Sequence, residues 1–568
     1  MVARQIKLVG IVIGMVVSLG VTGCGSATNS VNESKSALVT DPGDTGTKAS
    51  GGGVTVTNVY SEPKQLSVGD LMYVDLEKSA FSSLDFSGVN STAEFTLILA
   101  NTAADKGSVT VQMSGDISDP DLNLAKSLDI AAEDENDIGN IPTDITEKLH
   151  ETLRFQEKDL ESLDLLPEQP SVGKSIGSIS PDSSAPVAVG DTRPFKVLAS
   201  LSSSTSTVSV TAVAECVGSN VAFYVDNRVT NEMLSSTDVA DLCNKFDATV
   251  GKEQALFGSL SDVNQDGKVI VLLTPQVNHL GALGGGIVTG FFNATDLYPN
   301  SSTNLTSNNM EILYVMVPDP QGEYGSVISK KFALSNLLPA VLPHELQHAI
   351  SYNQHVFINK GSAEEAWLNE GLSHLAEDMF GENQENPSRY AMYLQNPQGY
   401  SLVAGRSPGL AARGGAYLFL RFLYEQSEEG NKFLSRIDQT SLTGISNIEK
   451  AFSGRSSDFD QFGEFFLRWN IALAVSDAGV TKDSHYTYRS RVKDASTGNW
   501  SGVCLRCNTE DGRGTVLSGV PLKAYSGAQS AVTAQSAARF YKVSTVKDKL
   551  SFNAISGGTG YGILIRTK

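Results

Sequence analysis

Two histidines and a glutamate at close spacing form the strongest chemical signal in this chain. In His344-Glu345-Leu346-Gln347-His348 the histidines stand four residues apart. On a helix that spacing puts both imidazoles on one face, where they can bind the same metal ion. Glu345 would lie beside them, where a carboxylate can take a proton from a metal-activated water. The alternative is a pair of ordinary helix-face histidines with a surface glutamate.

A third ligand is needed, because a catalytic zinc usually takes three protein ligands. The metzincin pattern is absent, since Ser351 and Gln354 stand where it requires Gly and His, and the residue order excludes the inverted motif. A glutamate on a following helix remains. Glu370 lies 22 residues after His348 (370 − 348), which leaves room for a loop and a returning antiparallel helix.

Five other residues near the motif have their own interpretations. Glu364 and Glu365 would stabilise the start of the second helix, where the helix dipole favours acidic groups. His374 lies one turn after Glu370; together with Ser373 it could hydrogen-bond the ligand histidines from outside the metal site. His355 fits a surface loop.

Around the motif, the pattern predicts strands that alternate with helices. Apolar strand patterns occupy 221–225, 268–273 and 311–317, and helical patterns cover about 363–380 and 411–426. The strand at 310–315 is expected to run along the cleft, where an extended substrate could pair with it. Pro339 and Pro343 precede the motif, so its helix either begins near Pro343 or kinks there.

A calcium-loop-like sequence precedes the second strand. Asp262, Asn264 and Asp266 have the opening spacing of an EF-hand loop, followed by Gly267. Leu273 stands at the twelfth position, where such a loop needs a glutamate. The interpretation favoured here is a tight turn between a helix and a strand.

The motif and its downstream segment resemble a known family. His-Glu-Leu-Gln-His followed by Trp-Leu-Asn-Glu-Gly-Leu-Ser (367–373) resembles the hyicolysin-type neutral zinc metallopeptidases, a branch of the gluzincins. The likeness covers about 220–475 and includes the segments 224–226, 309–314 and 414–420.

The resemblance implies an α+β, thermolysin-like catalytic domain with a mixed sheet and a mainly helical lower half. It further implies His344, His348 and Glu370 as zinc ligands and Glu345 as the general base. Tyr417, in the segment that follows, is a candidate donor to the reaction's oxyanion; otherwise it packs in the core.

Charge and the N-terminus indicate an exported protein. The formal net charge of −20 excludes a nucleic-acid backbone as an expected partner. A basic start and an apolar run to Val21 predict a signal peptide over 1–23. The small residues before Cys24 resemble a bacterial lipobox, which implies a lipid anchor on Cys24 and an extracytoplasmic, membrane-bound protein. A plain secretory signal is the alternative. Residues 24–53 read as a polar tether.

The remaining chain is expected to form three parts. Residues 54–214 are predicted to be a β-rich accessory domain or pro-domain with a helical insert around 145–153. Residues 215–484 would be the peptidase domain, and 485–568 a C-terminal β module, both β parts resembling sandwiches. Four cysteines remain after Cys24, and pairing within each close pair, Cys216 with Cys243 and Cys504 with Cys507, is the simplest disulfide pattern.

Together these features predict a zinc metalloendopeptidase that acts as a monomer on proteins or peptides. An aminopeptidase of the same class is one alternative, although the Gly-x-Met-Glu-Asn amine anchor of one such family is absent; only Met310-Glu311 stands in a comparable strand. A surface-anchored binding protein with an inactive zinc site is the other. The intact Glu345 argues against it, because a structural site has no use for a base.

Overall fold

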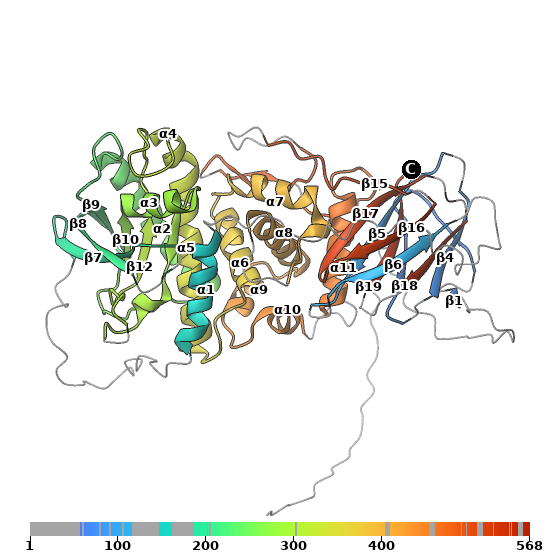
Figure 1. Cartoon of the computed structure of the whole chain (residues 1–568), viewed down its shortest axis with the longest axis horizontal. Helices are drawn as coiled ribbons and strands as arrows, with labels where there is room; N and C mark the ends of the chain where they lie inside the picture. The colour runs from blue at the N-terminus through green and yellow to red at the C-terminus, as the bar shows by residue number, and fades with distance from the viewer. Residues whose placement is uncertain are drawn as a thin grey trace, which may run out of the picture. The chain divides into compact units, whose positions relative to one another are not determined.

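The computed structural model describes most of the chain after residue 186 and several segments before it (Figure 1). The described ranges are 57–58, 62–78, 81–89, 92–104, 107–115, 147–161 and 187–568, the last without 202, 204–205, 302–303, 404–408, 454–460, 490, 496, 508–514, 526, 545, 547 and 555–559. The predicted signal peptide, Cys24 and the tether lie outside these residues. No helix within the described ranges is long and apolar enough to cross a membrane.

A six-stranded mixed sheet carries the first half of the predicted catalytic region. Its order is β11-β12-β10-β9-β8-β7. The central strands are β9 (Val221–Asp226), β10 (Val269–Leu273) and β12 (Ile312–Val315), which run parallel and are buried along their whole length. These are the three strands predicted from the sequence. β11 (Gly290–Phe292) forms one edge and pairs antiparallel with β12.

The predicted boundary at residue 214 differs from the observed sheet. β7 (Thr192–Leu198) and β8 (Thr207–Val217) extend the six-stranded sheet beyond β9, both in antiparallel pairs. A Cys216–Cys243 disulfide ties β8 to α2 (Ser236–Phe257), which packs against β8, β9 and the motif helix. Cys504 and Cys507 form the second disulfide. The described part of the chain that builds this sheet therefore begins near residue 187.

Helices make up the second half of this part. α5 (Leu338–Tyr352) carries the motif and packs against α6 (Ala366–Met379), which in turn packs against α8 (Leu410–Gln426). α7 (Asn386–Gln395) lies on α8, and three more helices complete the layer: α9 (Asn431–Asp438), α10 (Gly444–Phe452) and α11 (Phe462–Val475). The described chain is thus a mixed α and β protein, in agreement with the predicted class.

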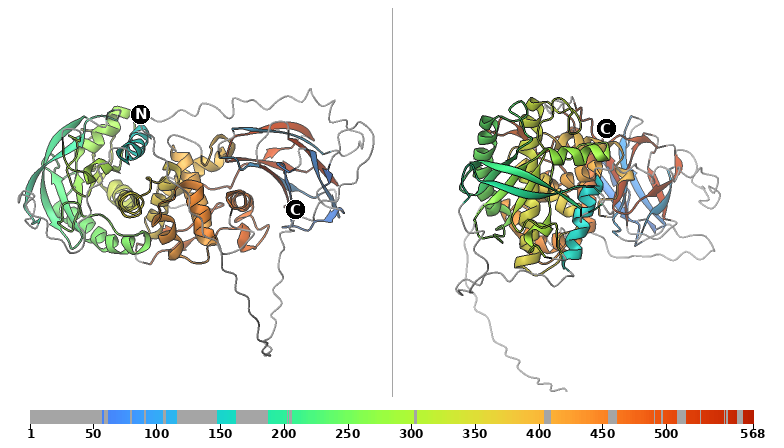
Figure 2. Two further views of the ribbon diagram at one scale, coloured as in Figure 1. Left: turned by 90° about the horizontal axis from the view of Figure 1, so that it is seen from below. Right: turned by 60° about the vertical axis from the view of Figure 1, so that its left-hand side comes forward.

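The N- and C-terminal β regions, expected to be two modules, pair into the same sheets. One sheet has the order β1-β4-β18-β6-β16 with β2 beside β4, and the other β15-β17-β5-β19-β3. In the second sheet, β5 (Phe95–Asn101) lies between β17 (Ala537–Val543) and β19 (Gly560–Arg566). Figure 2 shows the blue N-terminal and red C-terminal strands interleaved. Neither region could cover its apolar face alone, and residues from both ends share one core.

The remaining strands of these two sheets are two to seven residues long. They are β1 (Thr57–Asn58), β2 (Lys64–Gln65), β3 (Leu71–Asp75), β4 (Phe81–Ser87), β6 (Val109–Ser114), β15 (Lys523–Ala524), β16 (Ala528–Thr533) and β18 (Lys549–Ala554). The helical insert is α1 (Glu147–Glu161), which contacts the 3₁₀ turn η3 (Ala294–Leu297) next to β11.

The calcium-like sequence folds as the favoured turn. Asp262 accepts a hydrogen bond from the amide of Gly267 (3.1 Å), and Asp266 accepts one from the amide of Lys268 (2.8 Å). Gln265 and Gly267 both have positive φ, which a turn of this kind requires. These side chains therefore satisfy the local backbone.

Candidate metal centre

The motif helix is continuous through its prolines. Pro339 lies in the first turn of α5 and Pro343 inside it, and a π-helical segment (Ala333–Leu337) precedes them. Because helical backbone already precedes Pro339, each of the two prolines removes one backbone donor from a helical run, and Pro343 does so directly before His344. Every residue of α5 is buried, including the four polar residues of the motif. A buried polar side chain needs a hydrogen-bonding or ionic partner.

Glu370 meets the two histidines from α6. Its carboxylate oxygens lie 3.5 Å from Nε2 of His344 and 3.7 Å from Nε2 of His348. One ligand atom from each of the three residues falls within 4.8 Å of the others, as a metal site requires. Burial opposes ionisation of Glu370, but the cations around it, Arg413 first, hold its pKa well below the ordinary value.

Both imidazoles are held through their other nitrogen. Nδ1 of His344 bonds Glu377 (2.8 Å), and Nδ1 of His348 bonds Asn369 (2.9 Å), with the hydroxyl of Ser373 at 3.1 Å. Such outer contacts fix the ring orientation and direct Nε2 towards the metal. The predicted role of Ser373 is therefore consistent with the geometry, and Asn369 and Glu377 are additions to it.

The residues present fit a zinc ion. Two imidazole nitrogens and one carboxylate are a common donor set for catalytic zinc. Oε1 of Glu370 is buried and accepts no hydrogen bond from the described residues, which leaves it available to a cation. Oε2 of the same carboxylate is held by Arg413.

A second metal-compatible group shares His344. His344, His374 and Glu377 also have ligand atoms within 4.8 Å of one another. Here, however, Glu377 already bridges both histidines through Nδ1 (2.8 and 2.7 Å) and lies 3.3 Å from Arg389. We interpret Glu377 as the carboxylate that orients His344, with His374 and Arg389 supporting it.

Charge around the two ligand histidines is unequal. Burial disfavours the cation at His344, yet the carboxylates of Glu370 and Glu377 raise its pKa to about 8. Burial lowers the pKa of His348 well below the ordinary value, and its Nδ1 partner Asn369 carries no charge.

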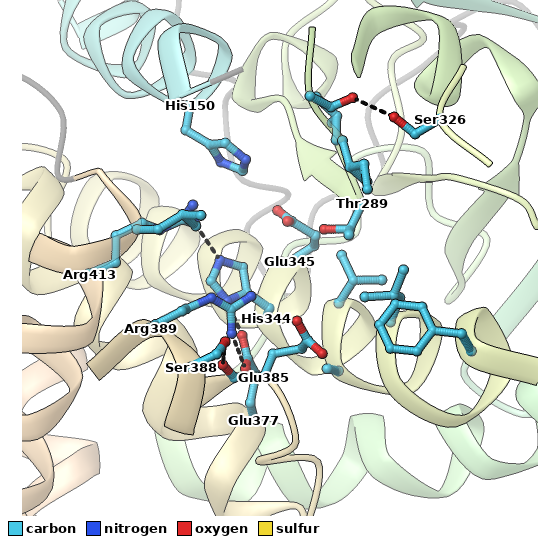
Figure 3. A pocket seen from close by; sticks show the side chains of 18 of the residues that line it. His150, Thr289, Ser326, His344, Glu345, Glu377, Glu385, Ser388, Arg389 and Arg413 are labelled. Carbon is cyan, nitrogen blue, oxygen red and sulfur yellow. Dashed lines mark hydrogen bonds and ion pairs between the residues drawn. The ribbon is translucent and has the colours of Figure 1, made fainter. Parts of the chain in front are cut away.

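Glu345 faces the same cavity, as Figure 3 shows. Its Oε2 accepts a hydrogen bond from the backbone amide of Phe292 on the edge strand (2.9 Å). Burial raises the pKa of Glu345. A carboxylate with a raised pKa beside a metal-ligand set is suited to accepting and returning a proton.

The predicted oxyanion donor, Tyr417, does not line the cavity. Its buried hydroxyl donates to Asp378 (3.0 Å). Arg413, one turn earlier on α8, reaches the site instead: its guanidinium bonds Glu370 and lies 3.3 Å from Nε2 of His344. Close helix packing places it there, since a Cβ at Gly414 would lie 2.4 Å from the backbone of Arg389 on α7.

The cavity beside the ligands has a volume of about 450 Å³. Its wall combines apolar side chains with cations and with one residue from α1. The apolar members include Phe332, Leu337, Val341, Met392 and Leu410; the polar members include His150, Arg389 and Arg413 (Figure 3).

Two sequence-based interpretations were wrong. His355 is fully buried in a π-helical segment (Asn353–Ile358) rather than in a surface loop. Glu364 is buried as well, and it accepts hydrogen bonds from the amide of Gly444 and from Asn447 instead of facing solvent at a helix start. Glu365, half-buried, accepts a hydrogen bond from the indole of Trp367 (2.8 Å).

The strand next to the cleft also differs from the expected one. The segment 312–315 forms β12, the second strand of the sheet, whereas β11 forms the edge near Glu345. β11 is only three residues long and follows a glycine-rich stretch, so its pattern was too short to recognise. Glu377 was detectable, because it lies seven residues after Glu370 on the same helix face.

Comparison with known proteins supports a metalloprotease. Over 269 residues the chain is 28% identical to the neutral metalloprotease ShpI of Staphylococcus hyicus; the match covers 46% of this chain and 58% of that protein. No family model matches the chain.

Proposed function

We propose that this protein is a zinc-dependent metalloendopeptidase of the gluzincin type, which hydrolyses peptide bonds of proteins or peptides as a monomer. One observation carries the proposal: His344, His348 and Glu370 converge within 4.8 Å beside Glu345, at a cavity next to a sheet edge. The similarity to a neutral metalloprotease supports the same class.

The zinc and the protein have separate tasks in this scheme. When bound by His344, His348 and Glu370, zinc would polarise the peptide carbonyl and acidify a water. Glu345 then serves as the base that takes the proton and returns it to the leaving amine. The amide of Phe292 donates to one oxygen of Glu345 and thereby fixes the direction of the carboxylate.

Arg413 replaces Tyr417 as the proposed donor to the developing oxyanion. It is buried, cationic and within hydrogen-bonding distance of the ligand set. Zinc and the guanidinium could not both use Nε2 of His344, so Arg413 would have to leave that nitrogen when His344 holds zinc. The bond of Arg413 to Oε2 of Glu370 leaves Oε1 for the metal and would keep the guanidinium close to the carbonyl of a bound peptide.

β11 is the proposed docking strand for substrate. In its register with β12, Thr289 and Phe291 use their backbone groups for pairing, so Gly290 and Phe292 present theirs to the outer edge. An extended peptide can add there as a further strand. The neighbouring apolar wall of Leu337, Val341 and Met392 favours an apolar side chain next to the cleaved bond.

Export and attachment complete the proposal. We propose that the signal peptide is removed before Cys24 and that a lipid on Cys24 holds the enzyme at an extracytoplasmic membrane surface. Metabolic labelling with a radioactive fatty acid tests this, with Cys24→Ser as the control. Labelling of the variant at the wild-type level would contradict the anchor.

Replacing Glu345 by Gln tests the chemistry. Casein digestion by the zinc-loaded protein should fall below about one hundredth of the wild-type rate, because the base is lost. Zinc content should remain near one ion per chain, whereas His348→Ala should lose both zinc and activity. Wild-type turnover by the Glu345→Gln protein would refute the mechanism, and a comparison of N-blocked with free peptides separates endo- from aminopeptidase action.

A further inference from the structure

Helix α1 comes from the N-terminal part of the chain but packs at the candidate active site. Its apolar side chains Leu149, Leu153 and Leu160 recur at helical spacing and are all buried. The helix contacts η3, the turn that directly follows the edge strand β11. In Figure 1 it is drawn between α5 and α6. Apolar burial therefore holds α1 on the catalytic part.

His150 of α1 points into the cavity, towards the metal ligands. It belongs to the cavity wall together with His344 and Glu345 (Figure 3). Its Nδ1 lies 3.9 Å from Oε1 of Glu370, the ligand oxygen with no hydrogen bond from the described residues. His150 is nevertheless not part of the three-residue ligand set. It stands where the reacting part of a substrate has to enter.

Arg154, one turn after His150, engages the edge strand. Its Nη2 donates to the carbonyl oxygen of Phe292 (3.5 Å), and its Nη1 pairs with Glu157 (2.8 Å). The side chains of Arg154 and Glu157 are only 5% and 2% exposed. An ordinary surface helix turns such residues to solvent, whereas α1 buries them against the site. The Phe292 carbonyl is one of the outward-facing acceptors that a pairing peptide would use.

We infer that α1 is an intramolecular inhibitor that occupies the peptide-binding groove of this same chain. His150 blocks the approach to the metal ligands, and Arg154 takes the edge-strand acceptor at Phe292. The inference rests on the proposed peptidase function, because it identifies the displaced partner as an extended peptide. A substrate can bind only when α1 leaves, so undocking of α1 lowers the apparent dissociation constant of the peptide.

Peptide binding to an inactive, zinc-loaded protein tests this competition without turnover. The background is Glu345→Gln in the full chain, and the probe is a fluorescein-labelled, N-blocked apolar decapeptide followed by anisotropy. Leu149→Ala with Leu153→Ala should loosen α1 and tighten binding by about tenfold or more. Arg154→Ala should act in the same direction. Lys158→Ala is the matched control, because Lys158 is exposed on the same helix.

A second measurement does not depend on a peptide. The chelator dipicolinate removes zinc from an accessible site. The rate of zinc removal should rise in the Leu149→Ala/Leu153→Ala protein but not in the Lys158→Ala protein. Thermal unfolding identifies any variant that has lost its fold, and the milder His150→Ala variant then replaces it.

The outcomes separate the two proposals. Tighter peptide binding with faster zinc removal supports the inhibitor. If the parent protein binds the peptide and none of the α1 variants binds it more tightly, the inhibitor proposal is overturned. In that case α1 is part of the substrate site. If no form binds peptide but zinc removal accelerates, the peptidase proposal fails while α1 still covers the metal site. A synthetic peptide of residues 147–161 should compete with the labelled peptide for the loosened variant.

Discussion

Glu377→Gln is the sharpest test of how the metal ligands are held. Glu377 is buried and its Oε1 lies 2.8 Å from Nδ1 of His344 and 2.7 Å from Nδ1 of His374, while Arg389 pairs with Oε2 at 3.3 Å. The substitution keeps the shape of the side chain and removes its charge. His344 stays in place but loses the carboxylate that fixes the orientation of its ring. That carboxylate also makes the imidazole more basic and therefore a stronger metal ligand.

The expected loss lies in zinc affinity. Removing an outer partner of a ligand histidine typically weakens metal binding by about 10–100-fold. Since each factor of ten corresponds to about 1.4 kcal/mol, the binding free energy should fall by about 1.4–2.8 kcal/mol. His344→Ala removes a ligand altogether and should abolish stoichiometric zinc binding, so the two variants differ in kind.

Competition with a fluorescent zinc chelator at pH 7.5 gives the affinity directly. The matched control is Glu425→Gln on α8, because Glu425 is equally buried in an ion pair, with Arg421 at 2.9 Å, but does not touch a ligand. Both substitutions should lower thermal stability, whereas only Glu377→Gln should weaken the binding of zinc. A zinc dissociation constant within about twofold of wild type would refute the orienting role.

The remaining predictions concern catalysis, pH and the disulfide. Arg413→Lys keeps the positive charge but loses the planar guanidinium with its paired N–H donors. It should lower kcat/KM on a peptide by about 100-fold at unchanged zinc content. A wild-type kcat/KM would show that Arg413 takes no part in the reaction. Burial raises the pKa of Glu253 well above 4.5, so the folded protein keeps a proton that the unfolded chain releases, and stability falls as pH rises above about 5. Glu253→Gln should therefore gain in Tm relative to wild type from pH 5 to pH 8 in calorimetric scans, and a pH-independent difference would contradict this. Replacing both Cys216 and Cys243 by Ser opens a link across 27 residues and should lower the free energy of unfolding in urea by about 3.5 kcal/mol; a loss below about 1 kcal/mol would contradict the expected constraint.

Local patterns in the sequence predicted part of the candidate metal centre. Helical spacing within 344–348 describes α5, because it depends on neighbours along the chain. The buried strands β9, β10 and β12 were recognisable for the same reason. Apolar runs of this length have few other ways to be buried. Glu370 on α6 followed instead from the exclusion of other third ligands and from a family resemblance.

Long-range pairing could not be predicted in the same way. Strand β5 has an apolar pattern that fits many partners, and nothing within 95–101 specifies 537–543 and 560–566 as its neighbours. The β regions were therefore assigned to separate modules. The choice of Tyr417 over Arg413 has a related cause: both lie on one face of α8, and only its packing on α6 and α7 decides which turn meets the metal ligands.

In the proposed mechanism, the charges of the site would let Arg413 serve two roles. Without zinc, the carboxylates of Glu345, Glu370 and Glu377 lie among Arg154, Arg389, Arg413 and a His344 whose pKa is raised to about 8. A zinc ion held by His344 would replace the proton on that imidazole and add one unit of positive charge to the site. Arg413 would then give up its contact with His344 and would be available to the oxyanion of the reaction. On this proposal, the residue that pairs with the carboxylate of Glu370 is the one that metal binding would release for catalysis.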